Sequence, residues 1–307
     1  MENRRAAISI NMIIMVILLV FSVAVILFFW SQFDWKSDID KEACHTSVVL
    51  RHSSNIKGSV QALPIPLKCK TEKICFTSGL FQNCDNQFAG EKYEKINIGG
   101  DETKLKEELS KLSYECWDML GRGLLEYHPR VWGWDKNYCS PCSRIAFSDE
   151  LHASVPSISY KELYKHMAEN KVPNPDLDMS YLRFLYGIED YPAVNVQLDD
   201  MEDRVQRGGG RIEDIDLGKQ HVVMVMMNKE GWGGTILGGV VGGIAAITVI
   251  SLTGGTAAIP IFLVGSGGGA RIASAFTSDA VFSPPTIMPY EAEYLQKLDC
   301  GEIDFVS

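Results

Sequence analysis

The chain has 307 residues, of which 46% are hydrophobic, and a formal net charge of −10 from 29 basic and 39 acidic residues. This length supplies about two domains' worth of chain and excludes a mini-protein that needs metal or disulfides merely to fold. The acidic balance leaves no basic stripe, which argues against nucleic acid as a partner.

The first expected element is a transmembrane signal anchor over residues 8–30. This stretch carries no charge and is rich in Ile, Val, Leu, Met and Phe. As a helix it would rise about 34 Å, more than the ~30 Å hydrocarbon core of a bilayer. A cleaved signal peptide is the alternative, but its apolar part normally covers about 7–15 residues. Arg4 and Arg5 favour a cytosolic tail at residues 1–7, a cell-membrane location and an extracellular or periplasmic main domain.

Residues 31–230 form the expected ectodomain, a disulfide-stapled α+β domain. Residues 44–100 are expected to be strands and loops, including SVVLRH at 47–52 and YEKINIG at 93–99. Asp101–Gly121 is predicted to be an amphipathic helix, because apolar residues recur at helical spacing with charges opposite. These apolar residues are Leu105, Leu109, Leu112, Cys116 and Met119.

The second half of this domain alternates short helices and strands. Ser159 and Glu162 match a capping box at the start of a helix that continues to about Asn170. Further elements are then expected in chain order: a short helix at Met179–Tyr186, a strand at Ala193–Leu198, an acidic flexible loop at Asp199–Gly218 and a strand at His221–Met227.

The block at residues 231–276 is apolar and rich in glycine. One stripe of small residues recurs every fourth position and a neighbouring stripe does the same, which on helices in a membrane favours close packing. The stripes contain Gly234, Gly238, Gly242 and Ala246, and then Gly239 and Gly243. We expect a glycine-zipper transmembrane hairpin; the alternatives are a single span and a Gly-rich soluble or surface-lying segment. A hairpin returns the tail at residues 277–307 to the ectodomain side.

All eight cysteines follow the expected anchor, and an even set outside the cytosol predicts four disulfides. They are Cys44, Cys69, Cys75, Cys84, Cys116, Cys139, Cys142 and Cys300. The sequence leaves their pairing open, since eight cysteines allow 105 connectivities.

Cys139-Ser140-Pro141-Cys142 is the motif with the most specific chemistry. It resembles the active-site motif of thioredoxin-like oxidoreductases, in which a CxxC at a helix N-terminus exchanges disulfides. No long helix is predicted after it, so structural disulfides are favoured over a redox pair. A zinc site would have to recruit His128 or His152 from a distance. We therefore expect no metal and no cofactor.

Three weaker patterns have ordinary structural interpretations. Residues 265–270 match GxGxxA and resemble a dinucleotide-binding fingerprint, but too little chain follows for that fold. The acidic residues of the 199–218 loop could hold calcium, although their spacing is irregular. An aromatic group could form a platform for a sugar or a protein partner, or pack in the core: Trp117, Tyr127, Trp132, Trp134 and Tyr138.

These patterns together predict a membrane-anchored, disulfide-stabilised and non-enzymatic component of a membrane or cell-surface assembly. Its partners would be the lipid bilayer and either copies of itself or other membrane proteins, through the glycine-zipper helices. Two alternatives are an extracytoplasmic thiol–disulfide oxidoreductase that uses the CSPC motif, and a pore-forming or membrane-permeabilising module.

Overall fold

The computed structural model falls into two units, Met1–Glu42 and Ala43–Ser307. It describes the chain over residues 10–32, 35–56, 65–125, 127, 137–188, 191–207, 211–229, 246–252, 257–263, 280–298 and 300–303.

The N-terminal stretch is helical, but a membrane anchor is not supported. Helix α1 (Ile10–Gln32) covers most of the apolar segment expected at residues 8–30. Across the described residues, no helix combines the length and the apolar character needed to cross a membrane. The prediction of a transmembrane anchor at residues 8–30 is therefore wrong for the described helix α1.

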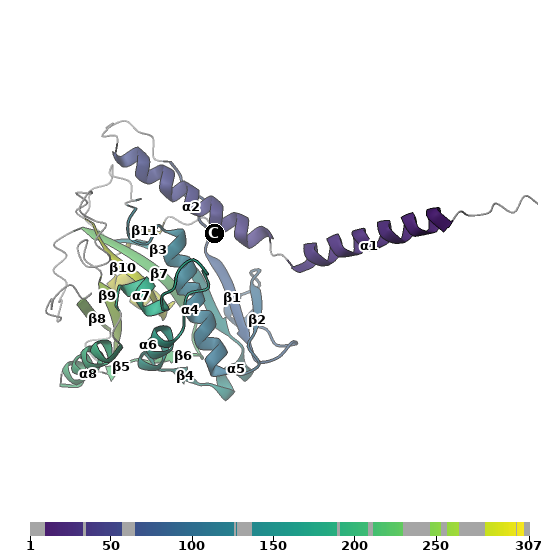
Figure 1. The fold of residues 1–307 in the computed structure, drawn as a ribbon. Coiled ribbons are helices and arrows are strands. Elements are labelled where there is room, and N and C mark those ends of the chain that lie inside the picture. Colours follow the sequence, from purple (N-terminus) through teal and green to yellow (C-terminus); the bar gives the residue numbers. More distant parts are fainter. Residues whose placement is uncertain are drawn as a thin grey trace, which may run out of the picture. The chain divides into compact units, whose positions relative to one another are not determined.

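A mixed sheet organises the second unit (Figure 1). Its strands run in the order β10-β7-β3-β1-β2, with β11 also paired to β3. The pairs β1–β2, β1–β3 and β11–β3 are parallel, whereas β3–β7 and β7–β10 are antiparallel. The strands are β1 (Glu72–Thr77), β2 (Glu94–Asn97), β3 (Asn137–Phe147), β7 (His221–Lys229), β10 (Ala280–Pro289) and β11 (Cys300–Ile303). The predicted α+β class is thus wrong: the domain is a mixed α/β fold, because helix α4 connects parallel strands.

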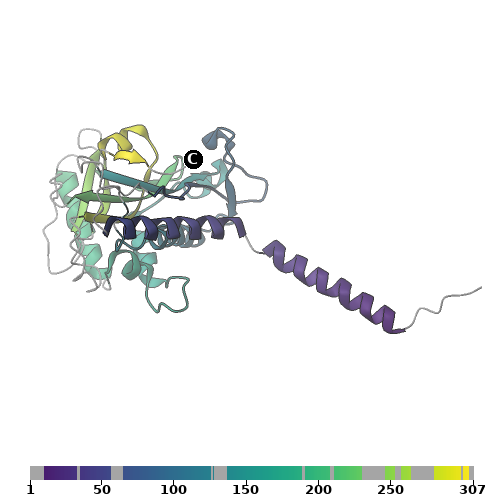
Figure 2. The same ribbon diagram turned by 90° about the horizontal axis from the view of Figure 1, so that it is seen from above.

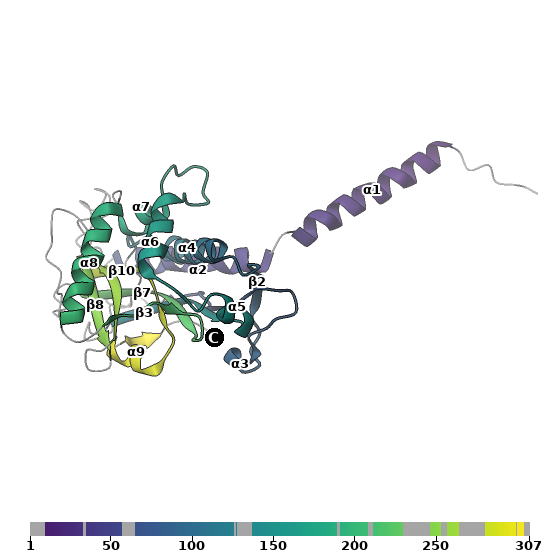
Figure 3. The ribbon, with the colours of Figure 1, turned by 90° about the horizontal axis from the view of Figure 1, so that it is seen from below.

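Helices cover both faces of this sheet. Figure 3 shows α4, α6 and α7 on one side of β3, β7 and β10, and α9 on the other; Figure 2 shows α9 as the yellow helix on its own side. The helices after α1 are α2 (Trp35–Ile56), α3 (Asp85–Phe88), α4 (Glu102–Met119), α5 (Asp149–Ser154), α6 (Tyr160–Glu169), α7 (Tyr181–Tyr186), α8 (Tyr191–Arg207) and α9 (Ala292–Lys297).

Strands β3 and β7 form the centre of the core. Ten of the eleven residues of β3 are buried, and the eleventh, Arg144, is partly exposed. Residues 221–227 of β7, HVVMVMM, are all buried as well. A strand covered on both faces reads as a continuous apolar run, which is why the prediction of a strand at His221–Met227 is confirmed. Ile145 and Phe147 of β3 and Phe76 of β1 belong to one buried hydrophobic cluster.

The amphipathic and capped helices match their predictions. Helix α4 buries Leu105, Leu109 and Leu112 and begins at the cap residue Asp101, whose carboxylate accepts hydrogen bonds from the amides of Thr103 and Lys104. Helix α6 begins after Ser159, whose hydroxyl accepts from the amide of Lys161. Helix α7 confirms the short helix expected near residues 179–186, and β2 confirms the strand within 93–99.

Two predicted strands are instead helical, because their burial follows helical spacing. The segment at 47–52 lies in α2, where Cys44, Val48 and Arg51 are buried on one face while Leu50 is exposed. Ala193–Leu198 and the first part of the predicted acidic loop at Asp199–Gly218 lie in α8.

The burial of its apolar residues explains why Ala193–Leu198 is helical rather than the predicted strand. Val194 and Leu198 are buried four positions apart, but Val196 is 66% exposed. A strand would have turned all three side chains to one face, whereas a helix separates the middle one. The remainder of the predicted loop contains β5 (Arg211–Ile212) and β6 (Ile215–Asp216), and β6 pairs with β4 (Ser157–Ile158).

The described parts of the 231–276 block are strands rather than transmembrane helices. Strands β8 (Ala246–Leu252) and β9 (Ala257–Leu263) pair antiparallel. Their β-branched residues suit extended backbone, and Pro260 would cost about 3 kcal/mol inside a helix. Ala246 begins β8, and the five zipper glycines lie outside the described residues. The transmembrane hairpin and its glycine zipper are therefore not supported.

We predict that Asp101→Ala lowers the free energy of unfolding by about 1 kcal/mol, because two amides at the start of α4 lose their acceptor. Asp101→Ser, which restores a capping oxygen, should recover most of this loss. Urea unfolding with the disulfides intact measures both variants. Equal stability of Asp101→Ala and the original chain would contradict the role of this cap.

Candidate functional site

The eight cysteines form four disulfides, as the sequence predicted, and no cysteine is free. Two of these bonds connect strand β3 to other elements, one to α4 and one to β11. The pairs are Cys44–Cys69, Cys75–Cys84, Cys116–Cys142 and Cys139–Cys300. The last pair joins residues 161 positions apart, so it closes most of the domain.

The two cysteines of the CSPC motif belong to different disulfides. Cys139 pairs with Cys300 and Cys142 pairs with Cys116, and both CSPC sulfurs are buried inside β3. Ser140 between them is also buried and is hydrogen-bonded to the hydroxyl of Tyr127 at 3.0 Å. A dithiol exchange centre pairs its own two cysteines and exposes one of them at a helix N-terminus. The structure does not place these residues in that arrangement.

The structure does not gather the other candidate ligands into a metal centre. Within the ranges that the structure describes, no group of three His, Cys, Asp or Glu side chains is placed to hold a metal ion. His152 lies 3.9 Å from Asp216, and His128 lies outside the described residues. The GxGxxA segment at 265–270 also lies outside them.

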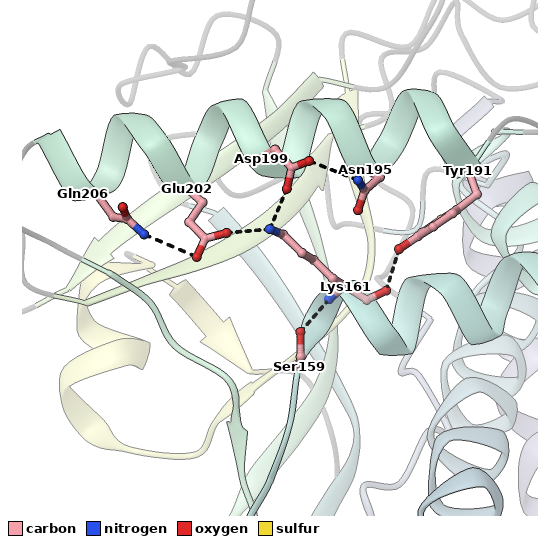
Figure 4. Close-up of polar contacts among 7 residues, drawn as sticks. All are labelled: Ser159, Lys161, Tyr191, Asn195, Asp199, Glu202 and Gln206. Atoms are coloured by element: carbon pink, nitrogen blue, oxygen red, sulfur yellow. Dashed lines mark hydrogen bonds and ion pairs between the residues drawn. The ribbon is translucent and has the colours of Figure 1, made fainter.

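Two of the acidic residues considered for calcium, Asp199 and Glu202, instead hold a lysine (Figure 4). Lys161 on α6 donates to Asp199 at 2.6 Å and to Glu202 at 2.5 Å, both on α8. These hydrogen bonds raise the pKa of Lys161. Asn195 donates to the second oxygen of Asp199, and the hydroxyl of Tyr191 donates to the carbonyl of Lys161. The cluster thus fastens α8 to α6, which is a structural role.

The aromatic group does not form a platform among the described residues. Trp117, Tyr127 and Tyr138 are buried in the core, where the rings of Tyr127 and Tyr138 meet edge to face. Trp132 and Trp134 lie outside the described residues. Sequence spacing could not distinguish a surface platform from this buried packing, because both require aromatic side chains close together.

The Cys75–Cys84 disulfide forms a surface feature that the sequence patterns did not identify. We call residues 75–84 the stapled loop. Its inner part is fixed, because the side-chain oxygen of Gln82 accepts hydrogen bonds from the Ser78 amide, the Ser78 hydroxyl and the Ser148 hydroxyl. Its tip is apolar and open: Leu80 is 78% and Phe81 97% exposed. The loop therefore presents two large apolar side chains on a rigid base.

A hollow of about 420 Å³, open to solvent, lies beside this tip where α3 and α5 approach each other. Its walls combine amides, aromatic rings and carboxylates, and contain no cationic side chain. They comprise Phe81, Gln82, Asn83, Cys84, Asn86, Gln87, Phe147, Asp149 and Glu150. Asp149 and Glu150 have no hydrogen bond or ion pair with any residue in the described part of the chain. The hollow is thus an acidic, acceptor-rich surface.

Arg144 on β3 ties the α3 region to the sheet. Its guanidinium lies 5.5 Å from the ring centre of Phe88 and 4.6 Å from that of Tyr290, which are cation–π distances. It also donates to Gln220 at 3.0 Å and lies 3.5 Å from Glu91. A hydrogen bond from Lys73 lowers the pKa of Glu91, and the charge of Arg144 adds to this effect.

Unmet hydrogen-bonding capacity collects in this same region. Among the described residues, three buried side-chain atoms lack a partner: Gln87 Oε1, Arg144 Nε and His221 Nε2. His221 is fully buried opposite Ile145 of β3, with its ring 5.9 Å from that of Phe147. Buried polar atoms are usually paired, since leaving one unmet costs about 1–3 kcal/mol. Three such atoms therefore lie on α3, β3 and β7 among the described residues.

The stapled loop could have been found from the sequence, but Arg144 could not. Two cysteines nine positions apart around the run Gly79-Leu80-Phe81 indicate a short closed loop with an apolar tip. Nothing in the sequence near Arg144 indicates Phe88, Tyr290 or Gln220 as its neighbours, because these come from distant elements.

Comparison with protein-family models, with curated proteins and with solved structures gives no match for this chain. Function must accordingly be argued from the described geometry.

Burial lowers the pKa of His221 to about 4. The unfolded imidazole, with a pKa near 6.5, binds its proton before the folded one does, so stability should fall as the pH drops from 6.5 towards 4. This loss should reach about 3 kcal/mol between pH 7 and pH 4. Urea unfolding of His221→Gln should lack this component, whereas His152→Gln should retain it. The same pH dependence in both variants would contradict a buried neutral His221.

Proposed function

We propose that this chain is a disulfide-locked, non-enzymatic binding component of a cell-surface or other extracytoplasmic assembly. The observation that carries the proposal is the division of the CSPC motif between Cys116–Cys142 and Cys139–Cys300. Buried disulfides that connect separate elements stabilise a domain, and such bonds persist in oxidising compartments outside the cytosol. A domain built this way is suited to presenting a fixed surface to a partner.

Two further features favour a binding role over the oxidoreductase alternative. The stapled loop holds Leu80 and Phe81 on a fixed base, so little conformational freedom is lost when they contact a partner. Loops placed on a rigid scaffold commonly carry binding residues. The buried CSPC sulfurs, by contrast, offer no thiolate to a substrate, which weighs against the oxidoreductase alternative.

The proposal and the oxidoreductase alternative differ in what Cys300 should do. If Cys139 and Cys300 form a structural bond, Cys139→Ser, Cys300→Ser and the double variant should each lower the free energy of unfolding by about 2–5 kcal/mol. None of them should change the rate at which the chain reduces or oxidises a model disulfide such as insulin, because that rate should be near background throughout.

Exchange activity that Cys139→Ser abolishes and Cys300→Ser preserves would contradict the proposal, since only a reactive cysteine behaves in this way. Cys75→Ser with Cys84→Ser serves as the matched control. It removes the disulfide of the stapled loop and keeps both β3 disulfides.

A further inference from the structure

We infer that the stapled loop and the hollow beside it dock a protein that offers an arginine or lysine side chain next to an apolar patch. This deepens the proposed function and rests on it. The inference joins two adjacent features, an apolar tip and an acidic hollow, to which Phe81 is common.

The tip has the character of an interface anchor. Phe81 is 97% exposed and Leu80 is 78% exposed, side by side at the end of a closed loop. Large aromatic side chains in desolvated pockets contribute a large share of the binding energy at protein interfaces. The tip is also pre-positioned, because Gln82 binds Ser78 and Ser148 and the Cys84 amide donates to the hydroxyl of Tyr93. Binding therefore costs little further conformational entropy in the loop.

The hollow selects a cationic side chain on the partner, next to the surface that contacts the tip. Asp149 and Glu150 place two carboxylates in its wall without an ion pair or hydrogen bond to the described residues. Phe147 and Phe81 add ring surface, and Asn86 adds an amide. A guanidinium or ammonium group gains from all three, through charge-assisted hydrogen bonds, ring contacts and amide oxygens. An anionic group would meet two carboxylates and no cation.

The same charges argue against an anionic lipid surface as the occupant. An apolar tip that inserts into such a membrane is normally accompanied by basic residues, which the negative surface potential attracts. Here Asp149 and Glu150 lie beside the tip, and Asp85 follows the loop directly. The complementary surface is a basic and apolar patch on a protein.

Selection of peptides tests this inference directly. Random short peptides displayed on phage are selected on the full oxidised chain, and the binders are synthesised and titrated. We expect binders that carry Arg or Lys beside an apolar residue. Their affinity should fall at least about tenfold with Phe81→Ala and again with Asp149→Asn plus Glu150→Gln. Replacing the peptide's cation with glutamine should weaken binding to the original chain similarly.

The controls match each substitution in kind. Val196→Ala truncates an exposed apolar residue on α8, and Asp176→Asn neutralises an exposed carboxylate elsewhere, so both should leave affinity unchanged. A disulfide map identical to that of the original chain shows that each variant is folded. Failure to select any peptide, binders without a cation, or binding unaffected by the Phe81 and Asp149/Glu150 variants would overturn the inference.

Co-sedimentation with vesicles of phosphatidylcholine and phosphatidylglycerol covers the other occupant. Vesicle binding lost in Phe81→Ala would assign the tip to a membrane and also overturn the inference. These outcomes are separate from the test of the proposed function. If docking fails while the Cys139–Cys300 bond proves structural, the surface is wrong and the proposed function remains.

Discussion

The disulfide pair on strand β3 is the constraint from which the rest of the second unit follows. Along one edge, β3 pairs with β11 at residues 137–139 and with β1 at residues 143–147, while β7 pairs along the other edge. Hydrogen bonds fix these neighbours within the sheet plane. Cys142 then ties the strand to α4 above the sheet, and Cys139 ties it to the C-terminal strand. A motif typical of redox chemistry therefore acts as a junction between layers.

The exposed stapled loop lies at the margin of this buried centre. The centre of the sheet is buried and cross-linked, so an exposed binding surface has to lie at its margin. There the stapled loop projects Phe81 beside an acidic hollow. Arg144 connects that periphery to the centre, since it reaches from β3 to Phe88 and Tyr290. Unlike an exposed ion pair, which contributes little, this contact is half-buried between two rings. Helix α3, which follows the stapled loop, is thereby tied to strand β3.

How far the sequence predicts this structure depends on the range of the interactions involved. Local signals succeeded: the cap at Asp101 and the spacing of Leu105 and Leu109 specify α4, and an even set of cysteines specifies four disulfides. Features that depend on contacts between distant residues were not predicted. Val194, Val196 and Leu198 fit a strand as well as a helix until the neighbour that buries two of them is known. Apolar composition likewise predicted membrane helices at 231–276, where the described residues, 246–252 and 257–263, are paired strands.

Disulfide mapping of the unreduced protein tests the central claim most directly. The chain is digested at acidic pH, which prevents exchange, and the linked peptides are identified by mass spectrometry. We expect Cys142 to be recovered with Cys116 and Cys139 with Cys300, with no free thiol at any of the four positions. A bond between Cys139 and Cys142, or a thiol at either, would contradict the β3 junction and restore the redox interpretation of the motif.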